Sequence, residues 1–236
     1  MPDAGPPLRT RVGLIGLWEF DETDGATGAT LDDTSTTDPL MKVPLTISAG
    51  TVAFSSGTMT PSGVTVVASG PHPHLNSDVK MSQAVTLEAW VMASMPDQGT
   101  ATAPVVIAGL CSSINARNIS LLQIGKRWVA WIRTTSDPNG LPQLTSTADL
   151  TPGVMTHLMV VADATHRTLY VNGKVDSVDP SPGPPLNWDK AYKMVVGDEL
   201  SRNRQWSGTF ALVAMYNQAL SDSLVETNYL AGPSGK

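Results

Sequence analysis

Cysteine and long apolar runs are nearly absent from this 236-residue sequence. Cys111 is the one cysteine, so an intrachain disulfide and a multi-cysteine zinc site are both excluded. A small buried apolar side chain is the favoured interpretation of Cys111. No run approaches the roughly 18 apolar residues of a membrane-spanning helix, and the first residues lack an apolar segment. We therefore expect neither membrane insertion nor a secretory signal within these residues.

Charge is also scarce, and its balance is acidic. Charged residues make up 15% of the sequence, with 15 Lys and Arg against 21 Asp and Glu, for a net charge of −6. This balance argues against a nucleic-acid partner, because a nucleic-acid-binding surface requires clustered Lys and Arg. Apolar residues reach 41%, which is enough to bury a core.

Short β-rich runs separated by turn residues fill most of the sequence. Residues 1–11 form a Pro-rich leader that we expect to be flexible, and residues 12–236 are predicted to form a single domain, a common length for a β-sandwich. Repeated short strands with turn signals between them are typical of an all-β sandwich or barrel. These runs cover residues 64–67, 84–92, 104–110, 119–124, 127–135 and 157–162.

The clearest local signal is a β-hairpin at residues 167–178. Asn172-Gly173 lies between two strand-like runs, and a type I′ turn favours this pair because both central residues need a positive φ. A proline-dense segment follows at residues 180–186. It is predicted to be a loop, because proline cannot donate a hydrogen bond to a sheet.

One short helix is predicted near the C-terminus. Ser223 and Glu226 have the spacing of a capping box, and Gly232 with Pro233 ends the helical pattern. We expect three leucines to hold this helix against the sheet: Leu220, Leu224 and Leu230.

Four segments, in this order, resemble the strands of one family. They are Gly16–Glu22 (GLWEFDE), Ala84–Val91 (AVTLEAWV), His157–Lys174 with its LYVNG motif, and Trp206–Ser221 (WSGTFALVAMYNQALS). They are similar to laminin G-like jelly rolls of the concanavalin A-like lectin/glucanase superfamily, from about residue 13 to 232. The resemblance implies an all-β, two-sheet antiparallel jelly-roll sandwich with one short C-terminal helix. It implies a fold rather than a function.

The sequence lacks the acidic motif of the superfamily's hydrolases. Those enzymes carry carboxylates in a pattern such as E-x-D-x-x-E, because residues two apart on a strand point to the same face. Here Glu88 is the only carboxylate inside a strong strand, and its neighbours at that spacing are Thr86 and Trp90. We therefore predict a non-enzymatic protein with no catalytic residues. A β-glucan hydrolase is the outside alternative, and it would depend on Glu88.

Tryptophans beside charged residues are the predicted ligand-binding positions. Trp90 alternates with Glu88, and Trp131 alternates with Arg133. If their strands share a sheet, these residues form the mixed aromatic and polar patch that suits a sugar. The alternative is that Trp90 and Trp131 fill the core. Trp188, beside the proline-dense loop, is the more exposed candidate.

Calcium is the one cofactor that the resemblance implies, because many related sandwiches hold this ion with oxygen ligands. Asp21, Asp198 and Glu199 are the candidate ligands. The acidic residue that the family often carries after the glycine of its closing strand is missing after Gly208, so we predict that no cofactor is required. His72-Pro73-His74 is interpreted as an exposed loop, because a third metal ligand is not apparent.

The leading functional hypothesis is a non-catalytic interaction module, either glycan-binding or surface-adhesive. The alternative is a structural virion protein, such as a phage tail or capsid-decorating subunit. The predicted partner is a glycan, a cell surface or a virion component. Self-association into a homo-oligomer is also predicted, because a sandwich with few charges leaves its sheet edges poorly protected. The matching locations are extracellular or cell-surface for a secreted protein and the virion surface for a phage protein.

Overall fold

In a computed structural model, the described residues fold into fourteen strands and two short helices. The structure describes residues 7–113, 115–180 and 183–234, without the side chains of 64–66. The strands are β1 (Leu14–Trp18), β2 (Thr30–Leu31), β3 (Leu45–Phe54), β4 (Met59–Ser69), β5 (Val85–Ala93), β6 (Val105–Ser113), β7 (Ala116–Ile124), β8 (Arg127–Ile132), β9 (Leu144–Thr145), β10 (Thr156–Ala162), β11 (Arg167–Val171), β12 (Lys174–Asp179), β13 (Lys193–Val196) and β14 (Gly208–Tyr216). The helices are α1 (Pro73–Ser82) and α2 (Asp222–Ala231).

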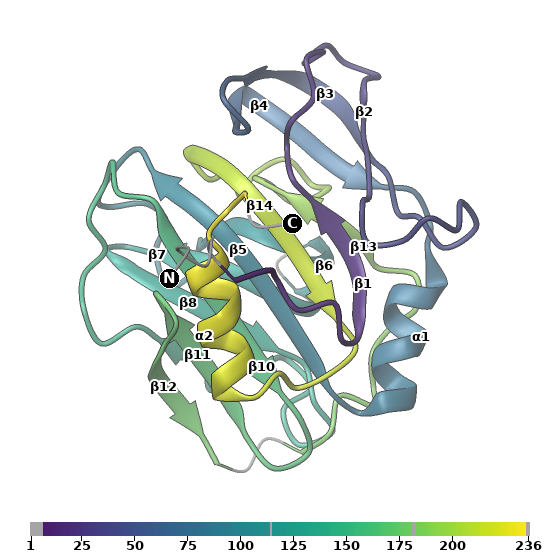
Figure 1. Cartoon of the computed structure of the whole chain (residues 1–236). Coiled ribbons are helices and arrows are strands. Elements are labelled where there is room, and N and C mark those ends of the chain that lie inside the picture. The colour runs from purple at the N-terminus through teal and green to yellow at the C-terminus, as the bar shows by residue number, and fades with distance from the viewer. Residues whose placement is uncertain (1–6, 114, 181–182, 235–236) are drawn as a thin grey trace, which may run out of the picture.

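The strands form two layers that are joined into one curved sheet (Figure 1). The first layer has the order β12-β11-β10-β5-β14-β1, and the second has the order β2-β3-β4-β13-β6-β7-β8-β9. The named strands pair in antiparallel fashion throughout. One residue pair, Phe210 with Met59, links the layers through β14 and β4. The predicted all-β antiparallel jelly-roll sandwich is therefore confirmed.

The main core lies between the two layers. Leu87, Ala89 and Val91 of β5 point into it at the spacing of two that a strand imposes. From the second layer, Leu121 and Trp128 belong to the same cluster. Both strand faces are buried in β5, β7 and β10. The sequences of β5 and β10 therefore read as mostly apolar runs rather than as a clean alternation, whereas β7 buries four polar side chains: Arg117, Asn118, Ser120 and Gln123.

The predicted C-terminal helix is confirmed as α2, which lies across the outer face of the first layer (Figure 1). Its N-cap is Ser221 and no side chain caps it, so the expected capping box of Ser223 and Glu226 does not form. Val225, Asn228 and Ala231 are the buried positions of the helix. Contrary to the prediction, Leu230 does not hold the helix against the sheet: it is 56% exposed, because it falls on the opposite side of the helix.

The second helix, α1, corrects the interpretation of His72-Pro73-His74 as an exposed loop. Pro73 begins the helix, and this first position suits proline because the missing N–H has no partner there. Leu75, Asn76 and Val79 bury the inner side of the helix. Neither α1 nor α2 has the length or apolarity needed to cross a membrane among the residues that the structure describes.

The predicted hairpin is confirmed. Strands β11 and β12 pair in register around Asn172 and Gly173, whose φ angles are 52° and 74°. Two positive φ angles in succession are what a type I′ turn requires. In the loop after β12, residues 183–186 form no helix or strand, and residues 181–182 lie outside the described residues.

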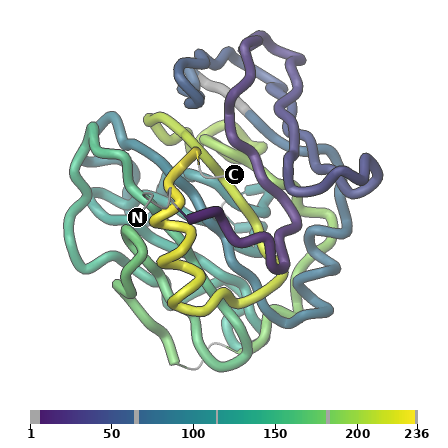
Figure 2. The backbone as a smooth tube through the Cα atoms, viewed as in Figure 1, coloured from purple at the N-terminus to yellow at the C-terminus, as the bar shows by residue number. Residues whose placement is uncertain are grey.

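The N-terminal segment runs beside α2 rather than away from the domain (Figure 2). An Arg9 guanidinium nitrogen donates to the Gly232 carbonyl over 2.8 Å, and the Thr10 amide donates to the Asn228 side chain over 2.9 Å. Of the predicted leader, residues 1–6 lie outside the described part of the chain. The described remainder is held against the outer face of the first layer.

Candidate functional site

Glu88 and Trp90 lie buried beneath α2. Glu88 is 0% exposed, and its Oε1 is paired with Arg9 and His157. Its Oε2 accepts hydrogen bonds from Tyr216 and Asn228. All of these partners hold a buried charge in place, so Glu88 is positioned as a structural carboxylate.

The Trp90 ring is packed between aromatic neighbours in the same region. It stacks on Tyr229 of α2 at a centroid distance of 5.8 Å and an interplanar angle of 6°. The His157 ring packs against the Trp90 ring, with 4.9 Å between the ring centroids. Trp90 is 7% exposed, so its apolar surface fixes the helix to the sheet instead of facing a ligand.

Trp188 is buried as well, in contrast to its expected exposure. It is 2% exposed and belongs to the main core. Its indole nitrogen donates to the Arg133 carbonyl over 2.7 Å. Asn187 donates to the Thr134 carbonyl beside it. Arg133 itself is half-buried directly after β8.

Trp90 and Trp131 do not form a common patch. Trp90 is on β5 of the first layer, and Trp131 is on β8 of the second layer. They belong to separate apolar clusters, one under α2 and one on the outer face of the second layer. The two strands do belong to the one curved sheet, but they lie in different layers of it, so the predicted patch does not form. Trp131 has a different polar environment of its own.

Trp131 lines a cavity of about 380 Å³ on the outer face of the second layer. We call it the Trp131 cavity. It is bordered by β7, β8 and four connecting loops, and its lining residues are Ala101, Thr102, Pro104, Asn115, Arg117, Trp131, Leu141, Gln143 and Arg204. An aromatic ring, two guanidinium groups and two side-chain amides therefore meet in one hollow. This is the mixed chemistry that ligand sites use to fix orientation.

Arg117 is the most tightly held of these residues. Its guanidinium carbon lies 3.8 Å from the centre of the Trp131 ring, a cation–π contact. Its Nη2 donates to the Asn139 carbonyl over 2.6 Å. Trp131 is fixed in turn, because its indole nitrogen donates to Gln143 over 3.0 Å. Burial lowers the Arg117 pKa to about 10, so the group is positively charged at neutral pH.

Arg204 approaches from the loop between β13 and β14. Its amide donates to Asp198 over 2.9 Å, and its carbonyl accepts from the Val106 amide over 2.8 Å. Glu199 lies behind the cavity, with its Oε1 3.9 Å from the Arg204 Nε. Burial raises the pKa of both Asp198 and Glu199. The loop therefore holds Arg204 by its backbone and leaves its side chain at the cavity.

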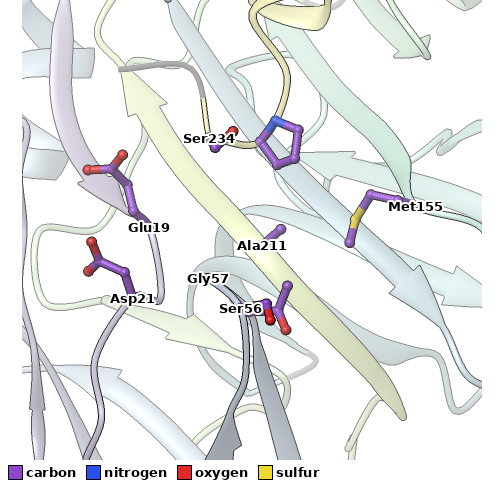
Figure 3. Close-up of a pocket in the computed structure, with 9 residues that line it drawn as sticks. Glu19, Asp21, Ser56, Gly57, Met155, Ala211 and Ser234 are labelled. Atoms are coloured by element: carbon purple, nitrogen blue, oxygen red, sulfur yellow. The ribbon is translucent and has the colours of Figure 1, made fainter.

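The three predicted calcium ligands are not brought together. Asp198 and Glu199 are buried behind the Trp131 cavity. Asp21 lines a different cavity, of about 270 Å³, beside the outer face of β14. Figure 3 shows Asp21 and Glu19 on one side of that second cavity and Met155 on the other. No group of three His, Cys, Asp or Glu suited to a metal occurs among the described residues. These three acids therefore do not fit a single calcium site.

Sequence reasoning identified Trp131 but missed Arg117, Arg204 and Gln143. Arg117 follows an irregular stretch of the β6–β7 pairing, where the alternation of faces is broken. Arg204 lies in a loop, where no residue periodicity indicates which way a side chain points. Basic residues are scarce in this sequence, with 15 Lys and Arg in total. This scarcity was the one sequence signal that could have drawn attention to individual arginines.

The family comparison confirms the resemblance. A family model described as the concanavalin A-like lectin/glucanases superfamily matches residues 47–226. The match covers most of the chain, which therefore belongs to this superfamily. No curated protein matches the chain.

Several solved structures share the fold. A Trypanosoma rangeli sialidase complex has a TM-score of 0.69 and 16% identity, over 99% of this chain and 36% of the sialidase chain. The receptor-binding domain of a botulinum neurotoxin C/D mosaic serotype has a TM-score of 0.66 and 10% identity, over 94% and 52%. Domain 4 of an extracellular arabinanase from Geobacillus stearothermophilus, in complex with arabinotriose, has a TM-score of 0.63 and 15% identity, over 95% and 99%. This chain thus spans about a third of the sialidase and nearly all of the arabinanase domain.

Proposed function

We propose that this chain is a non-catalytic carbohydrate-binding module and that the Trp131 cavity is its binding site. The observation that carries the proposal is the convergence of Trp131, Arg117, Arg204 and Gln143 on one hollow of about 380 Å³. Sugars offer many hydroxyl groups, and guanidinium and amide groups supply matching donors and acceptors. The pre-positioned Arg117 and Trp131 reduce the entropy cost of ordering side chains on binding.

The absence of an acid pair at the cavity supports the non-catalytic part of the proposal. Glycosidic bond cleavage uses two carboxyl groups on either side of the bond. Among the described residues that line the Trp131 cavity, none is acidic. Glu88, the residue on which a β-glucan hydrolase would depend, is fully buried under α2 with both oxygens engaged.

The comparisons support a carbohydrate ligand through domain 4 of the arabinanase, which was solved with arabinotriose and resembles almost the whole chain. An extracellular setting is proposed on the same ground, because that arabinanase is extracellular. Surface adhesion, a virion role and homo-oligomer formation stay predictions from the sequence.

Binding to immobilised polysaccharides tests the proposal directly. We expect the chain to be retained by at least one of arabinan, β-glucan, polygalacturonate and sialylated glycans, and to release no reducing sugar from any of them. Ala101 is exposed at the rim of the cavity, so Ala101→Trp should block the cavity without disturbing the core. We expect this variant to lose about tenfold or more in affinity, a cost of about 1.4 kcal/mol.

Ala26→Trp is the matched control, because Ala26 is exposed and does not line the Trp131 cavity. It should bind as the unchanged chain does. Retention of none of these polysaccharides contradicts the carbohydrate-binding proposal. Equal binding by the Ala101→Trp variant would instead place the carbohydrate site elsewhere on the surface.

A further inference from the structure

The two arginines of the Trp131 cavity have donor capacity that the protein itself does not use. The Nε atoms of Arg117 and Arg204 are both buried and have no hydrogen-bond partner among the described residues. Arg117 is only 8% exposed, so bulk water does not readily replace the missing partner. Arg204 Nε has only the Glu199 Oε1 nearby, at 3.9 Å, which is beyond hydrogen-bond length. A buried charged donor without a hydrogen bond destabilises the site. An acceptor that enters the cavity would offset that destabilisation.

The charges around the cavity favour an anionic acceptor. The described lining residues include two arginines and no carboxylate. Asp198 and Glu199 lie behind the lining, and one oxygen of each is engaged there, whereas Asp198 Oδ2 and Glu199 Oε2 are buried with no hydrogen-bond partner among the described residues. Asp198 accepts from the backbone amides of Glu199 and Arg204, and Glu199 accepts from the Ser201 hydroxyl. These acids reduce the local positive charge, but the groups that a ligand would touch are the two guanidinium groups.

The site is built around Arg117. One face of its guanidinium lies on Trp131, and Nη2 is held by the Asn139 carbonyl. The group therefore has little rotational freedom to lose when a ligand binds. A planar guanidinium matches the two oxygens of a carboxylate better than an ammonium does. A chain with a net charge of −6 would otherwise repel polyanions, so binding of one requires a local cationic site.

We propose that the Trp131 cavity selects acidic sugars, with a sugar carboxylate held by Arg117 and Arg204. The inference rests on the proposed carbohydrate-binding function and narrows its ligand class. The uncharged part of the sugar would face Gln143 and Thr102 at the rim. Binding should weaken as ionic strength rises, because salt screens the attraction between the carboxylate and the exposed side of the site.

Matched acidic and neutral probes test the selectivity. Polygalacturonate is compared with its full methyl ester, and 3′-sialyllactose is compared with lactose, by isothermal titration or retardation in affinity gels. We expect at least one acidic probe to bind about tenfold or more tightly than its neutral partner, the equivalent of one charge-assisted hydrogen bond. Equal binding of both members of each pair, or binding of neutral polysaccharides alone, overturns the inference while the carbohydrate-binding function stands. Binding of no saccharide at all contradicts both the acidic-sugar inference and the carbohydrate-binding function.

Variants in the loop between β13 and β14 test whether binding depends on Arg204 itself or on positive charge anywhere in that loop. Arg204→Gln should lose about tenfold of the affinity for the acidic probe, and Arg204→Lys should recover only part of it because an ammonium lacks the planar fork. Arg202→Gln removes the same charge from an exposed residue of the same loop that does not line the cavity, and we expect a change within about twofold. An equal loss in the Arg202 and Arg204 variants would overturn the assignment. Unchanged thermal melting of all three variants shows that the fold is intact.

Discussion

At the scale of single residues, Glu88 is the buried charge on which the outer face of the first layer depends. Burial alone would raise its pKa, but the Arg9 charge and the hydrogen bond from His157 lower it from 4.5 to about 2. Glu88 is therefore ionised in the folded protein at neutral pH. Its role is to bind together β5, β10, β14, α2 and the N-terminal segment.

This pKa predicts acid sensitivity. The folded-state pKa of Glu88 lies below its ordinary value, so its contribution to the free energy of unfolding is present above about pH 4.5. It is lost progressively as the pH falls towards about 2, with a total of about 3 kcal/mol. Urea unfolding at about pH 7 and about pH 3 measures the larger part of this loss, about 2 kcal/mol. Glu88→Gln should be less stable at neutral pH, because the buried Arg9 loses its partner, and should lose less stability on acidification.

Glu226→Gln is the control for the acid prediction. Glu226 is an exposed carboxylate on α2, and its replacement should leave the acid loss as in the unchanged chain. If Glu88→Gln and the unchanged chain lose the same stability between the two pH values, the acid sensitivity arises from other groups.

At the scale of elements, the turn between β11 and β12 is also the point where the hairpin meets α2. Gly173 has a φ of 74°, and a Cβ at this position would lie 2.8 Å from the Tyr229 Cβ. Tyr229 in turn stacks on Trp90. The same glycine therefore serves the turn conformation and the close approach of the helix.

Gly173→Ala should be destabilising for both reasons. The left-handed conformation costs about 1–2 kcal/mol for alanine, and the forced contact with α2 adds about 1–3 kcal/mol. Urea unfolding measures the sum. Gly153→Ala is the matched comparison, because Gly153 has a φ of 73° and nothing within 4 Å of the added Cβ. Equal losses in the two variants would show that the contact with Tyr229 relaxes freely.

At the scale of the whole molecule, residues near the two ends of the chain secure the same face. Arg9 pairs with Glu88 and donates to the Gly232 carbonyl, and Thr10 donates to Asn228. The outer face of the first layer is thereby closed by α2 and the N-terminal segment together. The outer face of the second layer is covered by loops, and it is there that the Trp131 cavity opens.

Deleting residues 1–11 should lower the melting temperature markedly. The deletion leaves Glu88 buried without its arginine, and breaking a buried ion pair costs about 3–5 kcal/mol. Differential scanning calorimetry provides the measurement. A chain that lacks only residues 1–7 keeps Arg9 and Thr10 and should melt close to the full chain. Equal melting of both truncated chains would mean that the Arg9 pair contributes little net stability.

Local interactions are the part of this fold that the sequence determined by itself. The Asn172-Gly173 turn needs only two positive φ angles, and the end of α2 needs only a glycine after its last turn. The strands were recognisable because apolar residues cluster between turn signals. Helix α1 is not predicted by the sequence pattern, because proline suits a loop and the first position of a helix equally well.

Only the tertiary structure decided which face of which layer each side chain occupies. Trp90 and Trp131 have the same local pattern, yet one is sealed beneath α2 and the other borders a cavity. Glu88 pairs with Arg9, which is 79 positions away in the sequence. Over such a separation, sequence spacing carries no geometric information. Arg117 and Arg204 meet at Trp131 for the same reason. The order in which the strands pair, rather than any local preference, brings a loop of the β13–β14 connection beside β7 and β8.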